Sequence, residues 1–214
     1  MLGIDERAAE DLRYLLSRGY GRISAVKFVG DKYKLDKPQR LLLYRGVYAP
    51  EGAAAHLKKL IGSDGIRQKK LSVDGFNVLL TVNSELKGIP NYLCDDGLVR
   101  DVSEIHSAAT KENLSKPLDL TISALRDLEA GRVYFVFDRL ISRSGELSKQ
   151  VYEEMRANSI AGESLTAESA DFEVLRRGEI AASSDSIIID KADRVFDLAA
   201  YVITKKIGHA PPKI

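Results

Sequence analysis

Apolar residues recur at helical spacing along the first part of the chain. Over residues 7–18 they repeat every three or four positions and two glycines follow, which predicts a helix that ends there. Shorter stretches of the same kind cover residues 24–29, a segment that opens at Lys37-Pro38, and residues 53–61. Residues 1–65 are therefore expected to form a small all-α, helix-turn-helix-like domain.

The pattern changes after Gly-Ser-Asp-Gly at residues 62–65, the best candidate for a linker. Residues 133–137 read Val-Tyr-Phe-Val-Phe, as expected for a strand buried on both faces, and shorter β-prone runs stand at 71–73 and 180–182. Helical patterns accompany these runs at residues 118–128, 146–156, 169–177 and 195–205. The alternation predicts an α/β domain over residues 66–214, with a mainly parallel sheet flanked by helices.

One segment interrupts the alternation. Residues 92–101 carry Asp96-Gly97 between apolar stretches, which is typical of a β-hairpin turn. The segment comes close after Asp74 in the chain. It would therefore bring Asp101 to the site described below, or leave it as decoration on the rim.

The composition is that of an ordinary globular protein, with 44% hydrophobic and 29% charged residues. The chain has no apolar run of about 18 residues that would span a bilayer, and its first residues turn acidic at once, unlike a signal peptide. The single cysteine, Cys94, excludes an intrachain disulfide and a cysteine cluster for zinc, and is expected in the core. We expect a cytoplasmic protein without a membrane partner.

The net charge of +1 conceals a division along the chain. Residues 1–70 carry 15 Lys and Arg against 8 Asp and Glu, net +7, whereas residues 71–214 carry 17 against 23, net −6. This asymmetry indicates a nucleic-acid partner for the first part. The candidate phosphate contacts are Arg18, Arg22, Lys27, Lys34 and, in the second part, Arg143. A solvated helical cap without such a partner is the alternative for the first part.

Three of the predicted strands each run into an aspartate. Asp74 and Asp138 follow their strands directly, and Asp185 follows its strand after two serines. Because parallel strands end at the same edge of a sheet, we expect these carboxylates to lie near one another, where they repel unless a cation compensates. Mg²⁺ or Mn²⁺ suits such oxygen ligands. The alternative is that each aspartate only caps the helix after its strand.

The residues around Asp74 resemble the opening motif of the NYN branch of the PIN-like nucleases. Residues 71–79 read Leu-Ser-Val-Asp-Gly-Phe-Asn-Val-Leu, similar to the hydrophobic strand that delivers Asp-Gly-Tyr/Phe-Asn in that family. The strand ending at Asp138, Ser-Ala-Asp at 169–171 and Ser-Ser-Asp at 183–185 follow in the family's order. The resemblance covers about residues 70–190. It implies a PIN-like, Rossmann-like fold.

The same resemblance implies hydrolysis of phosphodiester bonds, in RNA rather than DNA. It assigns one or two divalent cations to the carboxylates of Asp74, Asp138, Asp171 and Asp185, with Asp101 as a further candidate ligand. Such cations lower the pKa of a bound water and neutralise charge that develops on the scissile phosphate. Asn77, near the start of a helix, would orient that water or the phosphate, or would serve as a cap.

Two features depart from the family's pattern: the hairpin around Asp96-Gly97 is an insertion, and serines replace threonines at positions 169 and 183. Two rival functions remain, a non-catalytic RNA-binding protein with the same fold and a small-molecule phosphohydrolase. The second explains the aspartates but not the basic first part. The whole chain also resembles an uncharacterised archaeal family with a basic helical N-terminal domain, which implies no activity. The sequence leaves the oligomeric state open, a homo-oligomer included.

Overall fold

The computed structural model describes residues 4–102 and 113–214, and the chain divides into two compact units. The first unit comprises Met1–Lys58, Gly88–Ser103 and Pro211–Ile214, and the second comprises Lys59–Lys87 and Glu104–Ala210. The division at Lys58 lies near the linker expected at residues 62–65. The insertion and the last residues of the chain nevertheless join the first unit, so this unit is not continuous in sequence.

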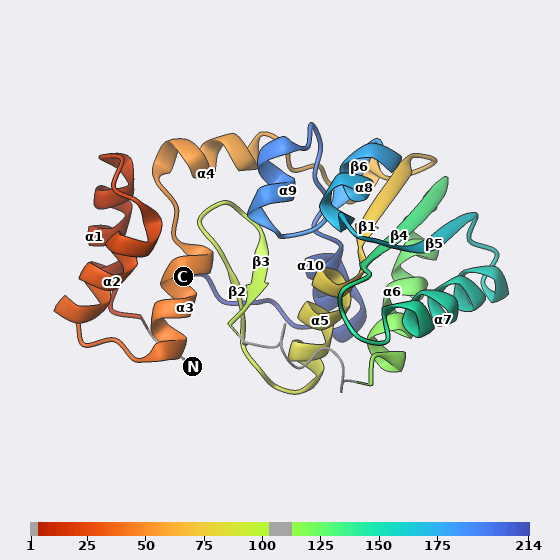
Figure 1. Cartoon of the computed structure of the whole chain (residues 1–214), viewed down its shortest axis with the longest axis horizontal. Helices are drawn as coiled ribbons and strands as arrows, with labels where there is room; N and C mark the ends of the chain where they lie inside the picture. Colours follow the sequence, from red (N-terminus) through yellow and green to blue (C-terminus); the bar gives the residue numbers. More distant parts are fainter. Residues whose placement is uncertain (1–3, 103–112) are drawn as a thin grey trace. The chain divides into compact units, whose positions relative to one another are not determined.

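The helical part of the first unit consists of short helices joined by tight turns (Figure 1). They are α1 (Glu6–Ser17), α2 (Arg22–Lys32), α3 (Lys37–Gly46) and α4 (Pro50–Leu57). Their core includes Leu12, Val29 and Leu43, all inaccessible to solvent. The sequence predicted the first three helices, and α4 begins at Pro50 rather than at residue 53 because proline fits the first turn of a helix.

The first unit also contains the hairpin formed by β2 (Asn91–Leu93) and β3 (Val99–Asp101). The described residues up to Lys58 are helical, as predicted, and the hairpin, which lies beyond residue 65, joins these helices in the same compact unit. Ion pairs with the helices attach the hairpin to this unit: Arg13 lies 2.7 Å from Asp95, and Arg45 lies 3.0 Å from Asp101. His56 Nδ1 lies 2.9 Å from Asp96, which Arg100 also binds from within the hairpin. Breaking such a buried pair by removing one partner is strongly destabilising. Cys94 is buried in the hairpin turn.

In the second unit, the described strands form a parallel sheet in the order β5-β4-β1-β6. Their bounds are β1 (Lys70–Asp74), β4 (Arg132–Asp138), β5 (Gly162–Ala167) and β6 (Ile180–Ala182). The expected α/β class and parallel sheet are confirmed. Strand β5 was not predicted, because it lies at the edge of the sheet, none of its side chains is fully buried and it carries no apolar run.

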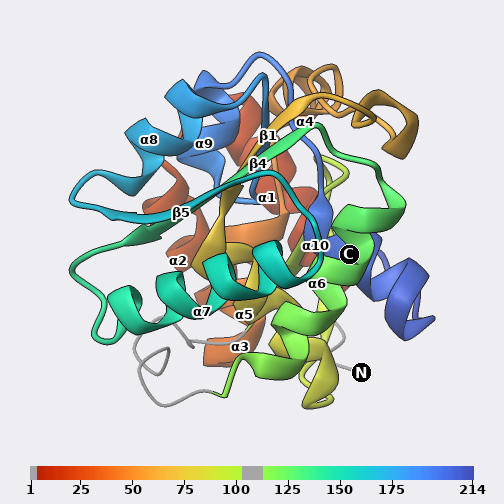
Figure 2. The ribbon, with the colours of Figure 1, turned by 90° about the vertical axis from the view of Figure 1, so that its right-hand side faces the viewer.

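Helices cover both faces of this sheet (Figures 1 and 2). One face is covered by α5 (Gly75–Leu86), α6 (Ser115–Asp127), α7 (Ser144–Ala157) and α10 (Leu198–Val202), and the other by α8 (Ala170–Arg177) and α9 (Ser186–Lys191). A π-helical turn, η4 (Ile203–Ile207), extends α10, and a 3₁₀ turn, η1 (Ser63–Gly65), precedes β1. Among the described residues, every helix is too short or too polar to cross a membrane.

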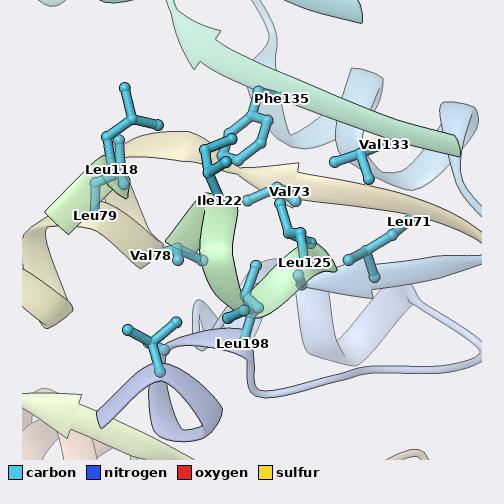
Figure 3. Packing of buried hydrophobic residues seen from close by; sticks show 14 of the residues in the cluster. Leu71, Val73, Val78, Leu79, Leu118, Ile122, Leu125, Val133, Phe135 and Leu198 are labelled. Atoms are coloured by element: carbon cyan, nitrogen blue, oxygen red, sulfur yellow. The ribbon is translucent and has the colours of Figure 1, made fainter. Parts of the chain in front are cut away.

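The core of the second unit lies between the sheet and the helices α5, α6 and α10 (Figure 3). Leu71 and Val73 alternate with Ser72 along β1, so both apolar side chains point toward these helices. Phe135 lies beside Ile122 of α6 in the same layer. This packing holds β1 between β4 and β6. The carboxyl end of β1, at Asp74, lies at the edge of the core.

Helix α5 approaches β4 so closely that residue 75 must be glycine. A Cβ atom at Gly75 would lie 2.2 Å from the ring of Phe137. The ring also packs edge-on against Phe76, with 5.2 Å between the ring centroids. The glycine of the Asp-Gly-Phe-Asn motif is thus explained by packing alone.

We expect Gly75→Ala to lower the free energy of unfolding by about 1–3 kcal/mol, because the added methyl group overpacks the contact with Phe137. Urea denaturation measures the change. Gly145→Ala in α7 is the matched control, since a Cβ there meets no atom within 4 Å and should leave stability unchanged or raise it. Equal stability of the two variants would contradict the packing explanation.

Candidate metal and phosphate site

Four aspartates of the second unit line one cavity of about 300 Å³. Asp74 ends β1, Asp138 ends β4, and Asp185 follows β6, which are neighbouring strands of the sheet. Asp171 reaches the cavity from the first turn of α8. The remaining lining residues are Phe76, Asn77, Ile141, Glu168, Ser169 and Ala170. The sheet therefore brings together the four aspartates that the sequence assigned to one site.

Asp74 is held by two hydrogen bonds at the junction of β1 and α5. Its Oδ2 accepts a 2.9 Å bond from Ser183 Oγ, and its Oδ1 accepts a long 3.4 Å bond from the backbone N–H of Asn77. The second contact makes Asp74 the N-cap of α5. Asp74 therefore has the helix-capping role that the sequence allowed, and this bond holds its carboxylate at the carboxyl end of β1.

The two serines after β6 connect the remaining parts of the site. Ser183 Oγ, besides donating to Asp74, accepts a 3.0 Å bond from the N–H of Asp185. The buried Asn77 accepts 2.9 Å and 3.1 Å bonds at Oδ1 from the N–H and Oγ of Ser184. The contacts of Asn77 therefore identify it as a positioning residue that ties α5 to the segment carrying Asp185.

Asp138 and Asp185 have equivalent local contacts. Asp138 Oδ1 accepts a 2.8 Å bond from the N–H of Leu140, and Asp185 Oδ1 accepts a 2.7 Å bond from the N–H of Ile187. Both are side-chain bonds to the backbone two residues ahead, which orient aspartates after strands. One oxygen of each carboxylate is engaged in this way.

The cavity disfavours negative charge. Burial raises the pKa of Asp74 to about 7, with the charges of Asp185 and Asp171 adding to the rise and the hydrogen bonds from Ser183 and Asn77 opposing it. Partial desolvation and the charges of Asp185 and Asp138 also raise the pKa of Asp171, whereas Lys191 lowers it. A cation in this cavity would relieve the repulsion.

The donor chemistry fits a hard divalent cation, because the candidate ligands are carboxylate oxygens. Across residues 4–102 and 113–214, however, no group of three or more His, Cys, Asp and Glu side chains stands in an arrangement that would already hold a metal. Asp74, Asp138 and Asp185 are instead hydrogen-bonded to the protein. A cation would share the oxygens of Asp74 with these bonds, because both oxygens accept one, whereas the bonds to Asp138 and Asp185 engage Oδ1 alone.

The structure does not place Asp101 in this cavity. Asp101 ends β3 in the first unit, where its Oδ1 accepts a 3.0 Å bond from Arg45 and its backbone carbonyl accepts a second bond from the same guanidinium. The position of Asp101 soon after Asp74 in the chain suggested proximity, but the hairpin is anchored elsewhere. The side chain of Asp101 is 8% exposed and forms an ion pair with Arg45 within the unit.

The predicted phosphate contacts divide into exposed residues and one that is bound within the first unit. Arg22 is half-buried and bound within the unit: its Nη1 donates 2.7 Å bonds to the carbonyls of Tyr44 and Val47, and its guanidinium lies 4.4 Å from the ring centroid of Tyr48. The exposed ones are Arg18, Lys27, Lys34 and Arg143. Arg143 occupies the N-cap position of α7, at φ 64°, and pairs with Glu146 at 2.8 Å.

The hairpin also changes the charge division. As folded, the first unit holds 13 Lys and Arg against 10 Asp and Glu, net +3, and the second holds 19 against 21, net −2. The contrast of +7 and −6 counted along the sequence is reduced for two reasons. Residues 59–70, net +3, belong to the second unit, and the hairpin segment 88–103, net −2, belongs to the first. Any basic surface of the first unit must therefore be local.

Sequence reasoning left several residues of the cavity unassigned. Ser183 was recognised only as part of a motif, although its hydroxyl joins Asp74 to Asp185. Ile141 and Glu168 line the cavity but belong to loops without any sequence pattern. Of these residues, only Ser183 could have been found from the sequence, because it stands where the related motif carries threonine.

The fold and the cavity define an α/β protein with an acidic site at the carboxyl ends of a parallel sheet. Residues 63–201, more than half of the chain, match the family described as a domain of unknown function, DUF5616, and the chain belongs to this family. Residues 6–59 match a second family, described as a protein of unknown function, DUF434. The two matches meet near the division of the units at Lys58, but the DUF5616 match also includes the hairpin of the first unit.

An uncharacterized protein of Methanocaldococcus jannaschii is 34% identical to this chain over 201 residues. The match covers 92% of this chain and 96% of the relative, so both units are shared. No solved structure matches the chain at a significant level.

The raised pKa of Asp74 predicts that Asp74→Asn stabilises the metal-free protein. An unfolded chain loses this proton near pH 4 and the folded chain near pH 7, so the wild type loses stability as the pH rises between these values. In EDTA, the free energy of unfolding of the variant should rise relative to that of the wild type over this pH range. At pH 8 it should be about 2–4 kcal/mol higher. Urea denaturation at several pH values measures the difference.

Asp193→Asn is the matched control, because Asp193 is an exposed aspartate of the same unit that does not line the cavity. Its effect should stay within about 0.5 kcal/mol and should not vary with pH. The explanation fails if Asp74→Asn is less stable than the wild type at pH 8.

Proposed function

We propose that the second unit is a divalent-metal-dependent nuclease that hydrolyses phosphodiester bonds in RNA. The observation that carries the proposal is the convergence of Asp74, Asp138 and Asp185 from neighbouring strands, with Asp171 from a helix, on one cavity. Strongly perturbed carboxylates in a cleft are typical of functional sites. A purely capping role for each aspartate would explain its hydrogen bond but not the shared cavity.

The proposal includes a PIN-like identity of the fold. Its support is the resemblance of four ordered motifs together with a parallel sheet in which β1 lies between β4 and β6. Each of the four motifs contributes an aspartate to the cavity wall. Fold alone does not define chemistry, so the proposal depends on the site.

Mg²⁺ or Mn²⁺, held by Asp74, Asp138, Asp171 and Asp185, would neutralise charge on the phosphate and make a nucleophile available at neutral pH. The protein's own residues would set the geometry. Ser183 orients Asp74 and the backbone of Asp185 together, and Asn77 holds the neighbouring Ser184. These bonds link β1 and β6, so the two carboxylates would move little relative to each other.

A second candidate is RNA binding without catalysis. It is favoured by the hydrogen bonds that engage Asp74, Asp138 and Asp185 in the metal-free state. If these bonds persist in the presence of metal, the protein would keep the fold but would not bind the metal that hydrolysis needs. The two candidates differ in one measurable property, turnover.

Purified full-length protein should cleave single-stranded or structured RNA with Mn²⁺ or Mg²⁺ and not in EDTA. Asp74→Asn should lower the single-turnover rate by about a hundredfold or more, since even loss of an outer-shell partner of a metal site costs about 10–100-fold. The Asp193→Asn control should cleave like the wild type. The urea denaturation measurements on Asp74→Asn establish whether it is folded under the conditions of the assay.

Three outcomes distinguish the functions. Wild type that binds RNA but is inert with every metal supports the non-catalytic candidate. Hydrolysis of p-nitrophenyl phosphate without RNA cleavage supports a small-molecule phosphohydrolase. Equal rates of RNA cleavage by wild type and Asp74→Asn would show that Asp74 has no role in the reaction.

A further inference from the structure

Large apolar side chains are exposed where α1 and α2 of the first unit meet. The exposed fractions are 59% for Tyr14, 59% for Tyr20, 75% for Ile23 and 62% for Phe28. We call the surface formed by Tyr14, Arg18, Tyr20, Ile23, Lys27 and Phe28 the α1–α2 corner. Isolated exposed apolar residues need no explanation, but a group of this kind on one supersecondary unit indicates a binding surface.

Helical geometry decides how these residues are placed. Ile23 and Lys27 are four residues apart and lie on one side of α2, whereas Phe28 is exposed about 100° further round the helix; the buried Val26 and Val29 face the core. On α1, Tyr14 and Arg18 are also four residues apart, with the guanidinium carbon 5.4 Å from the ring centroid. Helices α1 and α2 pack side by side.

Basic residues predominate in the segment that carries the corner. Residues 12–30 contain four basic residues, Arg13, Arg18, Arg22 and Lys27, and no Asp or Glu; the next residue, Asp31, lies one turn after Lys27 and pairs with Arg40 at 2.9 Å. Arg13 is paired with Asp95 at 2.7 Å and Arg22 bonds to backbone carbonyls. Arg18 and Lys27 are the two that are exposed at the corner.

The start of α2 adds a further positive element. Its N-cap is Gly21, which has no side chain to cap the first N–H groups of this 11-residue helix. Uncapped N–H groups and the helix dipole favour an anion at this end. The uncapped end lies between Tyr20 and Ile23, within the corner itself.

We propose that the α1–α2 corner binds single-stranded nucleic acid. Nucleobases would stack on Tyr14, Tyr20 and Phe28, and phosphates would contact Arg18, Lys27 and the start of α2. Aromatic rings interleaved with cations are the arrangement by which proteins hold single strands. The inference rests on the proposed function for the identity of the ligand, and it replaces Arg22 with aromatic residues as binding determinants.

The test measures binding in EDTA, where cleavage does not contribute. Full-length protein is titrated into fluorescein-labelled oligouridine, into a duplex of the same length, and into vesicles containing phosphatidylserine. Tyr20→Ala combined with Phe28→Ala should weaken binding to oligouridine by about tenfold or more, since each stacked base contributes about 1–3 kcal/mol. Tyr20→Phe, which retains the ring, should bind like the wild type.

The cation arm uses Arg18→Gln combined with Lys27→Gln. It should reduce the magnitude of the salt slope of binding by about 0.7 for each lost phosphate contact. The matched controls are Tyr152→Ala and Lys149→Gln, an exposed aromatic residue and an exposed lysine on α7. Neither control should change affinity or slope.

Unchanged oligouridine affinity in the Tyr20→Ala, Phe28→Ala variant overturns the inference. So does preferential binding to vesicles or to duplex that depends on the same residues. The two proposals can fail separately. If the wild type binds oligouridine through the corner but cleaves no RNA, only the nuclease proposal is contradicted. If the protein cleaves RNA but substitutions at the corner leave binding unchanged, only the proposal for the corner is contradicted.

Discussion

The parallel pairing of β1 with β4 on one side and β6 on the other decides where the polar chemistry of the second unit lies. The register places Val73 opposite both Phe135 and Ala182, so the chain leaves the three strands at the same edge of the sheet. The residue after each apolar run must then be polar, because it emerges from the core. Aspartate at these positions caps the following turn, and the shared edge makes the carboxylates neighbours.

At Asp74, two sets of interactions act in opposite directions on the charge of the carboxylate. Burial and the neighbouring carboxylates disfavour its charge, whereas Ser183 and the N–H of Asn77 stabilise it. Ionising Asp74 therefore costs the folded protein free energy, because the effect of burial outweighs that of these hydrogen bonds. Gly75 and Phe137 show the opposite case in the same motif, since their contact is explained by packing alone.

The first unit shows how little a charge count says about a surface. Arg13, Arg22, Arg45 and Arg100 all make bonds inside the unit, and the hairpin supplies the carboxylates for three of them. Burial opposes the charge of Asp96, but the hydrogen bonds from Arg100 and His56 outweigh it and keep the pKa of Asp96 below its usual range. The basic character that remains is local, at the end of α1 and the start of α2, where it coincides with exposed aromatic rings.

The sequence by itself determined the α/β class, the helices of the first unit, and the strands β1, β4 and β6, because apolar periodicity reports burial directly. It also determined that Asp74, Asp138 and Asp185 stand at strand ends. Strand β5 escaped prediction because an edge strand that is half exposed leaves no continuous apolar run.

Only the tertiary structure decided which unit the hairpin joins, that Asp101 pairs with Arg45, and that Arg22 is bound within its unit. It also decided that Ser183 bonds to Asp74, 109 residues earlier in the chain. Contacts between residues so far apart depend on how elements pack against one another. Local periodicity carries no information on that packing, so neither the ion pairs nor the raised pKa of Asp74 could be predicted before the chain was folded.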